Sequence, residues 1–300
     1  MTVREVADWL RKLDETLTPR NVNKHRQIVR NIYAYAERPD TYALQGNPVA
    51  ATDKRREPPP KRVDYFEVEE VESLAREAAG GAHRTHRAFR GEPVAYGHDE
   101  LAIQRAQDRQ DGELFRVLLY SGLRIGEARA LRWSDITFLP DMSGGLIHVQ
   151  RAVSATEEKP PKSWRPRTVP VPRPAAEALA RLQAREHFIG DDDYVFVNRV
   201  GARLEDSAIR RRFKAAREAA GLRDVKLHGL RHAAGSMIAH SAGVVVARDV
   251  LGHAKLETTS RYLHGKIDTR AVAAMNAAFG VRPQEGDSVP AETDAAGAGL

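Results

Sequence analysis

The sequence contains no cysteine in 300 residues. Disulfide bonds, thiolate chemistry and cysteine-based zinc or iron–sulfur sites are therefore excluded. A metal ion would need histidine and carboxylate ligands, and the histidines between residues 80 and 98 lack a regular metal-ligand spacing. We expect no metal site, and any covalent catalysis must use a nucleophile other than a thiol.

Long apolar runs are also missing from the sequence. No stretch approaches the roughly 18 uninterrupted apolar residues that a membrane span needs. Residues 1–17 carry charges throughout, where a signal peptide would have an apolar region. We therefore expect a cytoplasmic protein.

The chain is basic, with 47 Lys and Arg against 41 Asp and Glu and a formal net charge of +6. Its pI is about 9.6. The summed field of such a chain attracts polyanions and speeds encounter with nucleic acid. An arginine-rich composition alone gives the same pI, so the charge favours nucleic-acid binding without establishing it.

The pattern of apolar residues and prolines divides the chain into a small and a large domain. Two helices are expected over residues 3–17 and 18–38, in a helical domain that covers residues 1–52. Residues 53–63 combine basic side chains with three consecutive prolines, which favour an extended linker. A large domain then covers residues 64–281. The tail from residue 282 to residue 300 lacks large apolar side chains and is expected to be disordered.

The large domain is predicted to be mainly α with a small antiparallel β-sheet. The expected strands cover residues 146–153, 167–171 and 194–197. The expected helices cover residues 67–79, 99–120, 122–132, 174–187, 205–220, 227–240, 244–251, 256–264 and 269–278. A polar loop is expected over residues 80–98.

Two pairs of polar residues stand at helical spacing. His228 and Arg231 are three residues apart at a predicted helix start, so an imidazole and a guanidinium can face the same anion. Arg124 and Glu127 have the same spacing, and there the carboxylate can brace a neighbouring basic group. One such pair alone is typical of a solvated surface. Two separated arginines together suit phosphoryl transfer, because planar guanidinium groups bind phosphate oxygens and neutralise the developing charge.

A candidate nucleophile follows these pairs near the end of the large domain. The segment Leu251-Gly252-His253 is followed nine residues later by Tyr262. No serine or threonine stands in a recognisable nucleophile motif, so Tyr262 is the candidate covalent nucleophile. A phenol with an ordinary pKa near about 10 needs cationic neighbours or a base, and an arginine-lined pocket supplies cations.

Taken together, these segments resemble the tyrosine recombinase, or phage integrase, family. The first family box is similar to SGLRIGEARALRWSDI over residues 121–136, and the second to the order of His228, Arg231, His253 and Tyr262. The family carries a lysine in a hairpin ahead of an R-T-V-P strand. Lys162 precedes that strand here, with Lys159 as the alternative. The resemblance covers residues 65–280.

The resemblance implies a role for each matched residue. Tyr262 would attack the scissile phosphate to give a 3′-phosphotyrosyl link and a free 5′-hydroxyl, without metal, nucleotide or other cofactor. Arg124 and Arg231 would hold the non-bridging oxygens, and Lys162 would protonate the leaving oxygen. The accessory roles in hydrogen bonding and proton transfer would fall to His228 and His253, and Glu127 would hold the pocket together.

The implied partner is double-stranded DNA at specific recombination sites, bound by a homotetramer, with DNA-bending or excisionase proteins as possible accessory factors and the nucleoid as the place of action. Basic side chains in the small domain, the linker and a helix of the large domain are expected to contact phosphates, although solvated basic surfaces have the same composition. These residues are Lys24, Arg55, Arg56, Lys61, Arg62, Arg210, Arg211 and Lys214.

The small domain resembles only the last part of the family's DNA-clamping, or core-binding, domain, which is usually a bundle of about four helices. About 60 residues precede the large domain, enough for roughly two or three helices, so a shortened beginning is expected. Two alternatives to an active recombinase therefore stay open. One is a DNA-binding but catalytically impaired remnant, and the other is a relaxing enzyme similar to type IB topoisomerases.

Overall fold

The computed structural model describes residues 1–58, 64–84, 88–89, 92–93, 96–154, 157–160 and 166–252. The chain divides into two compact units, Met1–Lys61 and Arg62–Leu300, and the division falls inside the predicted linker. Of the helices in the described part of the chain, none has both the length and the apolar character that crossing a bilayer requires.

The first unit is built on the helices α1 (Val3–Asp14) and α2 (Pro19–Ala36). Thr2 begins α1 with reciprocal bonds, because its hydroxyl accepts the Glu5 N–H at 3.2 Å and the Glu5 carboxylate accepts the Thr2 N–H at 2.6 Å. Arg26 of α2 is buried and donates to the Val49 carbonyl at 3.0 Å, which fixes the chain after α2. The small buried core consists of Val6, Leu10, Val22 and Val49.

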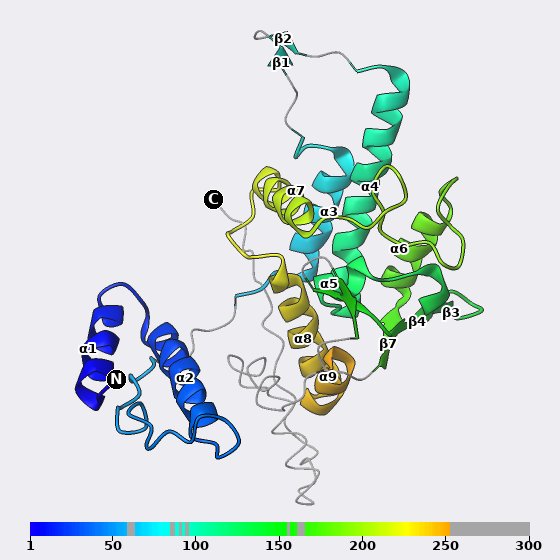
Figure 1. Ribbon diagram of the computed structural model, residues 1–300. Coiled ribbons are helices and arrows are strands. Elements are labelled where there is room, and N and C mark those ends of the chain that lie inside the picture. The colour runs from blue at the N-terminus through cyan, green and yellow to red at the C-terminus, as the bar shows by residue number, and fades with distance from the viewer. Residues whose placement is uncertain are drawn as a thin grey trace, which may run out of the picture. The chain divides into compact units, whose positions relative to one another are not determined.

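The second unit is mainly helical. Its described residues form the helices α3 (Val68–Gly80), α4 (His98–Ser121), α5 (Ile125–Arg129), α6 (Arg173–Gln183), α7 (Asp206–Ala219), α8 (His228–Ala242) and α9 (Val244–Leu251), and a 3₁₀ turn at Trp133–Asp135. The long helix α4 packs against α3, α6 and α8, while α9 packs on α8 (Figure 1). Apolar side chains from helices α3 to α8 and from the sheet form the main core, and Ala239, Ala247 and Leu251 form a small separate cluster of α8 and α9.

Helix α4 also carries buried carboxylates that pair with arginines from other elements. Asp111 accepts from the Arg212 side chain of α7 at 2.9 Å. Glu113 accepts from the Arg181 side chain of α6 at 2.7 and 2.9 Å. Burial of a charged side chain is costly unless the charge is paired. Because these carboxylates are paired, α4 can lie in the middle of the unit despite its many charged residues.

The part of the second unit that the structure describes also contains three short antiparallel sheets. The largest has the order β3 (Ile136–Phe138), β4 (Gly144–Val149), β7 (Arg167–Pro172), with Ile147 paired to Ile136 on one side and to Val169 on the other. The other sheets pair β1 (Ala88–Phe89) with β2 (Glu92–Pro93), and β5 (Ala152–Ser154) with β6 (Glu157–Lys159). The predicted fold class, mainly α with small antiparallel β-structure, is confirmed.

The strand predicted over residues 194–197 is wrong. This segment makes only isolated bridges, Arg132 with Tyr194 and Val197 with Arg203. Its polar backbone is satisfied partly by side chains, since the Val197 N–H donates to the Gln110 amide oxygen at 3.0 Å, while the Val195 N–H donates to the Leu131 carbonyl at 2.9 Å. The third strand of the sheet is β3, directly after the 3₁₀ turn.

Other expectations differ from the structure in smaller ways. The strand expected over residues 146–153 is divided between β4 and β5. The loop expected over residues 80–98 contains the hairpin β1–β2. The helices expected over residues 256–264 and 269–278, and the tail from residue 282, lie outside the described residues.

Candidate active site

The candidate site begins where α4 ends at a glycine. Gly122 follows Ser121 in the left-handed conformation, with φ at 64°, which only glycine adopts at little cost. A Cβ at this position would lie 2.6 Å from Cδ2 of Leu251, so α9 approaches the turn closely. The turn places Arg124 at the start of α5.

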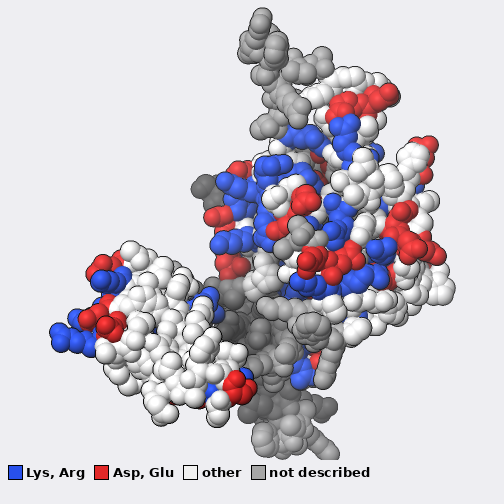
Figure 2. Space-filling view, in the orientation of Figure 1, with Lys and Arg blue, Asp and Glu red and all other residues white. Residues whose placement is uncertain are grey.

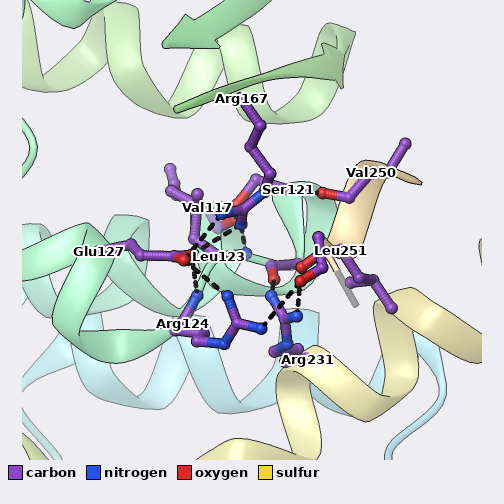
Figure 3. Close-up of polar contacts among 11 residues, drawn as sticks. Val117, Ser121, Leu123, Arg124, Glu127, Arg167, Arg231, Val250 and Leu251 are labelled. Carbon is purple, nitrogen blue, oxygen red and sulfur yellow. Dashed lines mark hydrogen bonds and ion pairs between the residues drawn. The ribbon is translucent and has the colours of Figure 1, made fainter. Parts of the chain in front are cut away.

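Glu127 lies at the centre of a buried ion-pair network (Figure 3). Its carboxylate accepts the backbone N–H of Arg124 at 2.8 Å and the Nη1 of the same residue at 2.8 Å. Arg167 of β7 donates to both carboxylate oxygens, each at 2.8 Å. Burial alone raises the pKa of Glu127, but these hydrogen bonds and the two positive charges outweigh it and bring the pKa down to about 2.

Three arginines hold the last carbonyl groups of α9. Arg231 of α8, which is buried, donates to the carbonyl of Gly122 and, at 2.5 Å, to that of Leu251. Arg124 donates to the Gly252 carbonyl at 3.3 Å, and Arg167 donates from Nε to the Val250 carbonyl at 3.2 Å. The carbonyl end of a helix carries partial negative charge, so this contact with cations is favourable. Figure 3 shows these side chains converging from separate elements.

His228 stands at the first position of α8 beside these arginines. Its ring meets that of His232 edge to face, with 4.6 Å between centroids. The pKa of His228 is lowered to about 4, first because burial removes part of its hydration. The charges of His232, Arg231, Arg124 and Arg210 lower it further. The imidazole is therefore neutral at pH 7 and can accept a proton or a hydrogen bond.

A cavity of about 290 Å³ opens beside this histidine. His228, Arg231 and Arg210 are its polar lining residues. Its other walls are apolar, formed by Leu118, Leu123, Ile125, Leu227 and Leu230. The combination offers a cationic edge beside a surface from which water is partly excluded, and charge interactions are stronger in such surroundings.

The predicted catalytic residues divide into two groups. The structure brings Arg124, Glu127, His228 and Arg231 together, although they come from α5 and α8. Lys162, His253 and Tyr262 lie outside the described residues. The alternative to Lys162, Lys159, lies in β6 and pairs with Glu157 at 2.7 Å.

The residues predicted to contact DNA are distributed over both units. Arg210, Arg211 and Lys214 are exposed on α7, and Figure 2 shows Lys and Arg side chains gathered on the face of the second unit that carries this helix. Arg210 pairs with Asp206 at 2.7 Å, an exposed contact of one helical turn. The neighbouring Arg212, by contrast, faces inward to its pair with Asp111.

In the first unit, Lys24 and Arg56 are exposed, while Arg55 is half-buried. Arg55 pairs with Asp14 at 2.9 Å, so a DNA phosphate would compete with this carboxylate. Lys61 and Arg62 lie outside the described residues.

Sequence reasoning missed one residue of the site, Arg167. The motif Arg167-Thr168-Val169-Pro170 served only to locate the lysine that precedes it. No local spacing links Arg167 to Glu127, 40 residues earlier in the chain. The one available sign was Glu127 itself, because a buried carboxylate needs more than one donor.

Curated tyrosine recombinases match this chain over about half of its length. Tyrosine recombinase XerC of Xanthomonas axonopodis pv. citri is 34% identical over 157 residues, which are 52% of this chain and 47% of the relative. XerC of Thermodesulfovibrio yellowstonii is 30% identical over 179 residues, or 57% of this chain and 53% of the relative. The chain thus spans about half the length of the curated relatives that it matches.

Solved structures share the fold at low sequence identity. The integrase of the Tn1549 transposon, in complex with a circular intermediate DNA, matches with a TM-score of 0.63 and 17% identity over 92% of this chain and 85% of the other. The XerH site-specific recombinase, bound to a palindromic difH substrate, matches with a TM-score of 0.64 and 17% identity over 93% of this chain and 73% of the other. The sequence model of the phage integrase family matches residues 99–268, which are more than half of the chain. This protein therefore belongs to the phage integrase family.

Proposed function

We propose that this chain is a site-specific DNA recombinase that cleaves and rejoins DNA strands through a 3′-phosphotyrosyl intermediate, as in the integration or excision of a mobile element. The observation that carries the proposal is the convergence of Arg124 and Arg231 at the end of α9, with His228 close enough for both charges to lower its pKa. Two guanidinium groups and an imidazole suit a phosphodiester whose charge grows during transfer. The sequence places the candidate nucleophile, Tyr262, shortly after this point.

In the proposed reaction the tyrosine oxygen of Tyr262 forms a bond to phosphorus as the bond to the 5′-oxygen breaks. The leaving 5′-oxygen takes a proton from Lys162, and Arg124 and Arg231 bind the non-bridging oxygens. The energy of the phosphodiester is kept in the covalent intermediate, so a second 5′-hydroxyl can reverse the step and join a new strand. No metal ion or nucleotide takes part in this scheme.

The neutral state of His228 defines its part in this reaction. An imidazole with a pKa of about 4 adds no charge to bind phosphate at pH 7. It can instead accept a hydrogen bond from the phenol of Tyr262 and assist the loss of its proton. We assign to His253, by its place in the motif, a hydrogen bond to the phosphate.

The partner in this proposal is double-stranded DNA. Support comes from the exposed basic side chains of α7 and from the net charge of +6. The Tn1549 integrase and XerH were both solved with DNA bound. Assembly of four copies on two sites, help from DNA-bending or excisionase proteins, and action at the nucleoid are further parts of the proposal.

The proposal is tested by trapping the intermediate. Duplexes bound by the protein are selected from randomised DNA, and a nick near the cleaved position makes a suicide substrate whose released fragment diffuses away. The wild type is expected to give a covalent adduct on a denaturing gel, and Tyr262→Phe is expected to bind the same DNA without an adduct. Binding with no adduct from either protein would contradict the proposed activity and favour a DNA-binding remnant.

A further inference from the structure

Arg167 connects three elements that each lead to a candidate catalytic residue. It is the first residue of β7, and its side chain is 11% exposed. Its two terminal nitrogens bind the Glu127 carboxylate of α5, and its Nε binds the Val250 carbonyl at the end of α9. Such a planar double contact fixes the orientation of both partners.

The two arginine partners of Glu127 make different numbers of side-chain hydrogen bonds to its carboxylate. Arg167 takes the double contact, while the side chain of Arg124 gives Glu127 a single N–H, from Nη1. Arg124 gives one further N–H to the Gly252 carbonyl. Since a guanidinium has several donors, these two contacts leave some of those of Arg124 for another oxygen. Without Arg167, Glu127 would be free to take a double contact from Arg124 itself.

We infer that Arg167 is a positioning residue, which occupies Glu127 and holds the end of α9 so that Arg124 keeps donors for the scissile phosphate. The inference rests on the proposed function. It assigns Arg167 no contact with DNA, and its effect passes through Arg124 and through the backbone at residues 250–252.

The charge of the network agrees with this role. Two arginines, Arg124 and Arg167, pair with the one carboxylate of Glu127, so this network keeps an excess of positive charge for an anion. If Glu127 had only Arg124 as its partner, that pair would be neutral. Removal of the Arg167 side chain is therefore expected to weaken the action of Arg124 on phosphate rather than the binding of the DNA duplex as a whole.

Two other candidate catalytic residues stand close in the sequence to Arg167 or to its carbonyl partner. Arg167 follows Lys162 by five residues, and the carbonyl that it binds belongs to Val250, three residues before His253. Three successive carbonyls at the end of α9 are each held by a different arginine. Loss of one of these contacts is expected to loosen the segment that leads to His253.

The test compares Arg167→Met and Arg167→Lys with wild type in single-turnover cleavage of the suicide substrate. The control is Arg173→Met, which removes an exposed arginine that pairs with Glu177 one helical turn away. For Arg167→Met we expect the rate at saturating DNA to fall about 10- to 100-fold, as for other side chains that orient a site, while the DNA Kd changes less than about threefold. Arg167→Lys should recover part of the rate, and Arg173→Met should match wild type.

A double substitution separates this role from general damage. If Arg167 acts through Glu127, the change Arg167→Met should cost much less in a Glu127→Gln background than in wild type, because the shared contact is already lost. If the two substitutions lower the cleavage rate independently, so that their fold-reductions multiply in the double variant, the inference is overturned. Equal fold-losses of cleavage rate and of DNA affinity would overturn it as well.

Hydrogen exchange gives a readout that does not need cleavage. Faster exchange in residues 244–252 of Arg167→Met, with unchanged exchange in α3, is expected, and unchanged exchange in both would contradict the hold on α9. If wild type forms no adduct, the proposed function fails, and the exchange comparison still decides whether Arg167 holds α9.

Discussion

At the scale of single residues, Glu127 and Asp111 show that two buried carboxylates paired with arginine can behave in opposite ways. Glu127 has two arginine partners and a backbone N–H, and its pKa falls to about 2. Asp111 has one arginine partner, and burial raises its pKa despite that contact. The ionised form of Glu127 therefore stabilises the fold, whereas the ionised form of Asp111 is tolerated at a cost.

This difference predicts how the stability of two variants depends on pH. The folded pKa of Glu127 is lower than its ordinary value of 4.5, so its contribution is complete above that value and is lost as the pH falls toward 2. From the change in pKa we expect Glu127→Gln to lower the free energy of unfolding at pH 7 by roughly 3 kcal/mol. The difference from wild type should shrink between about pH 5 and pH 2.

Urea denaturation at several pH values measures this effect. Asp111→Asn is the matched control, because it also removes a buried carboxylate charge, and its cost at pH 7 should be smaller. A Glu127→Gln cost that stays the same at low pH would show that the charge of Glu127 does not stabilise the fold.

At the scale of elements, the ends of helices assemble the site. α4 ends at Ser121, directly before Gly122, and α5 begins at Ile125, directly after Arg124. α8 begins at His228, and α9 ends at Leu251. The carbonyl groups that a helix leaves unpaired at its end become acceptors for the arginines of the site. The close approach of Gly122 to Leu251 keeps two of these ends together.

A pair of glycine substitutions tests the importance of this approach. Gly122 and Gly221 have nearly the same left-handed φ, 64° and 65°, but a Cβ at 221 would meet nothing within 4 Å. Gly221→Ala should therefore cost only the backbone strain, about 1–2 kcal/mol. Gly122→Ala should cost more, because its Cβ would also displace Leu251, whose carbonyl binds Arg231.

Thermal unfolding and the rate of adduct formation check this expectation. Gly122→Ala should slow adduct formation, while Gly221→Ala should leave the rate near that of wild type. Equal effects of the two substitutions on stability and on rate would contradict the role assigned to the contact between Gly122 and Leu251.

For the part of the whole molecule that the structure describes, the sequence was sufficient to predict most helices and two pairs of site residues in short motifs. Arg124 with Glu127, and His228 with Arg231, are local pairs whose spacing is visible in the chain. Arg167 was not predictable, because its contact with Glu127 depends on how β7 packs against α5. The strand expected over residues 194–197 failed for a similar reason, since its apolar residues enter the core as an irregular segment.

The covalent bond proposed between Tyr262 and DNA can be identified by mass spectrometry of the trapped adduct. After digestion with nuclease and trypsin, cleavage beyond Arg261 and Lys266 should release the peptide Tyr262-Leu-His-Gly-Lys266. We expect this peptide to carry a nucleotide bound through its 3′-phosphate to the phenol of Tyr262. Attachment to another residue, or a link through a 5′-phosphate, would contradict this expectation.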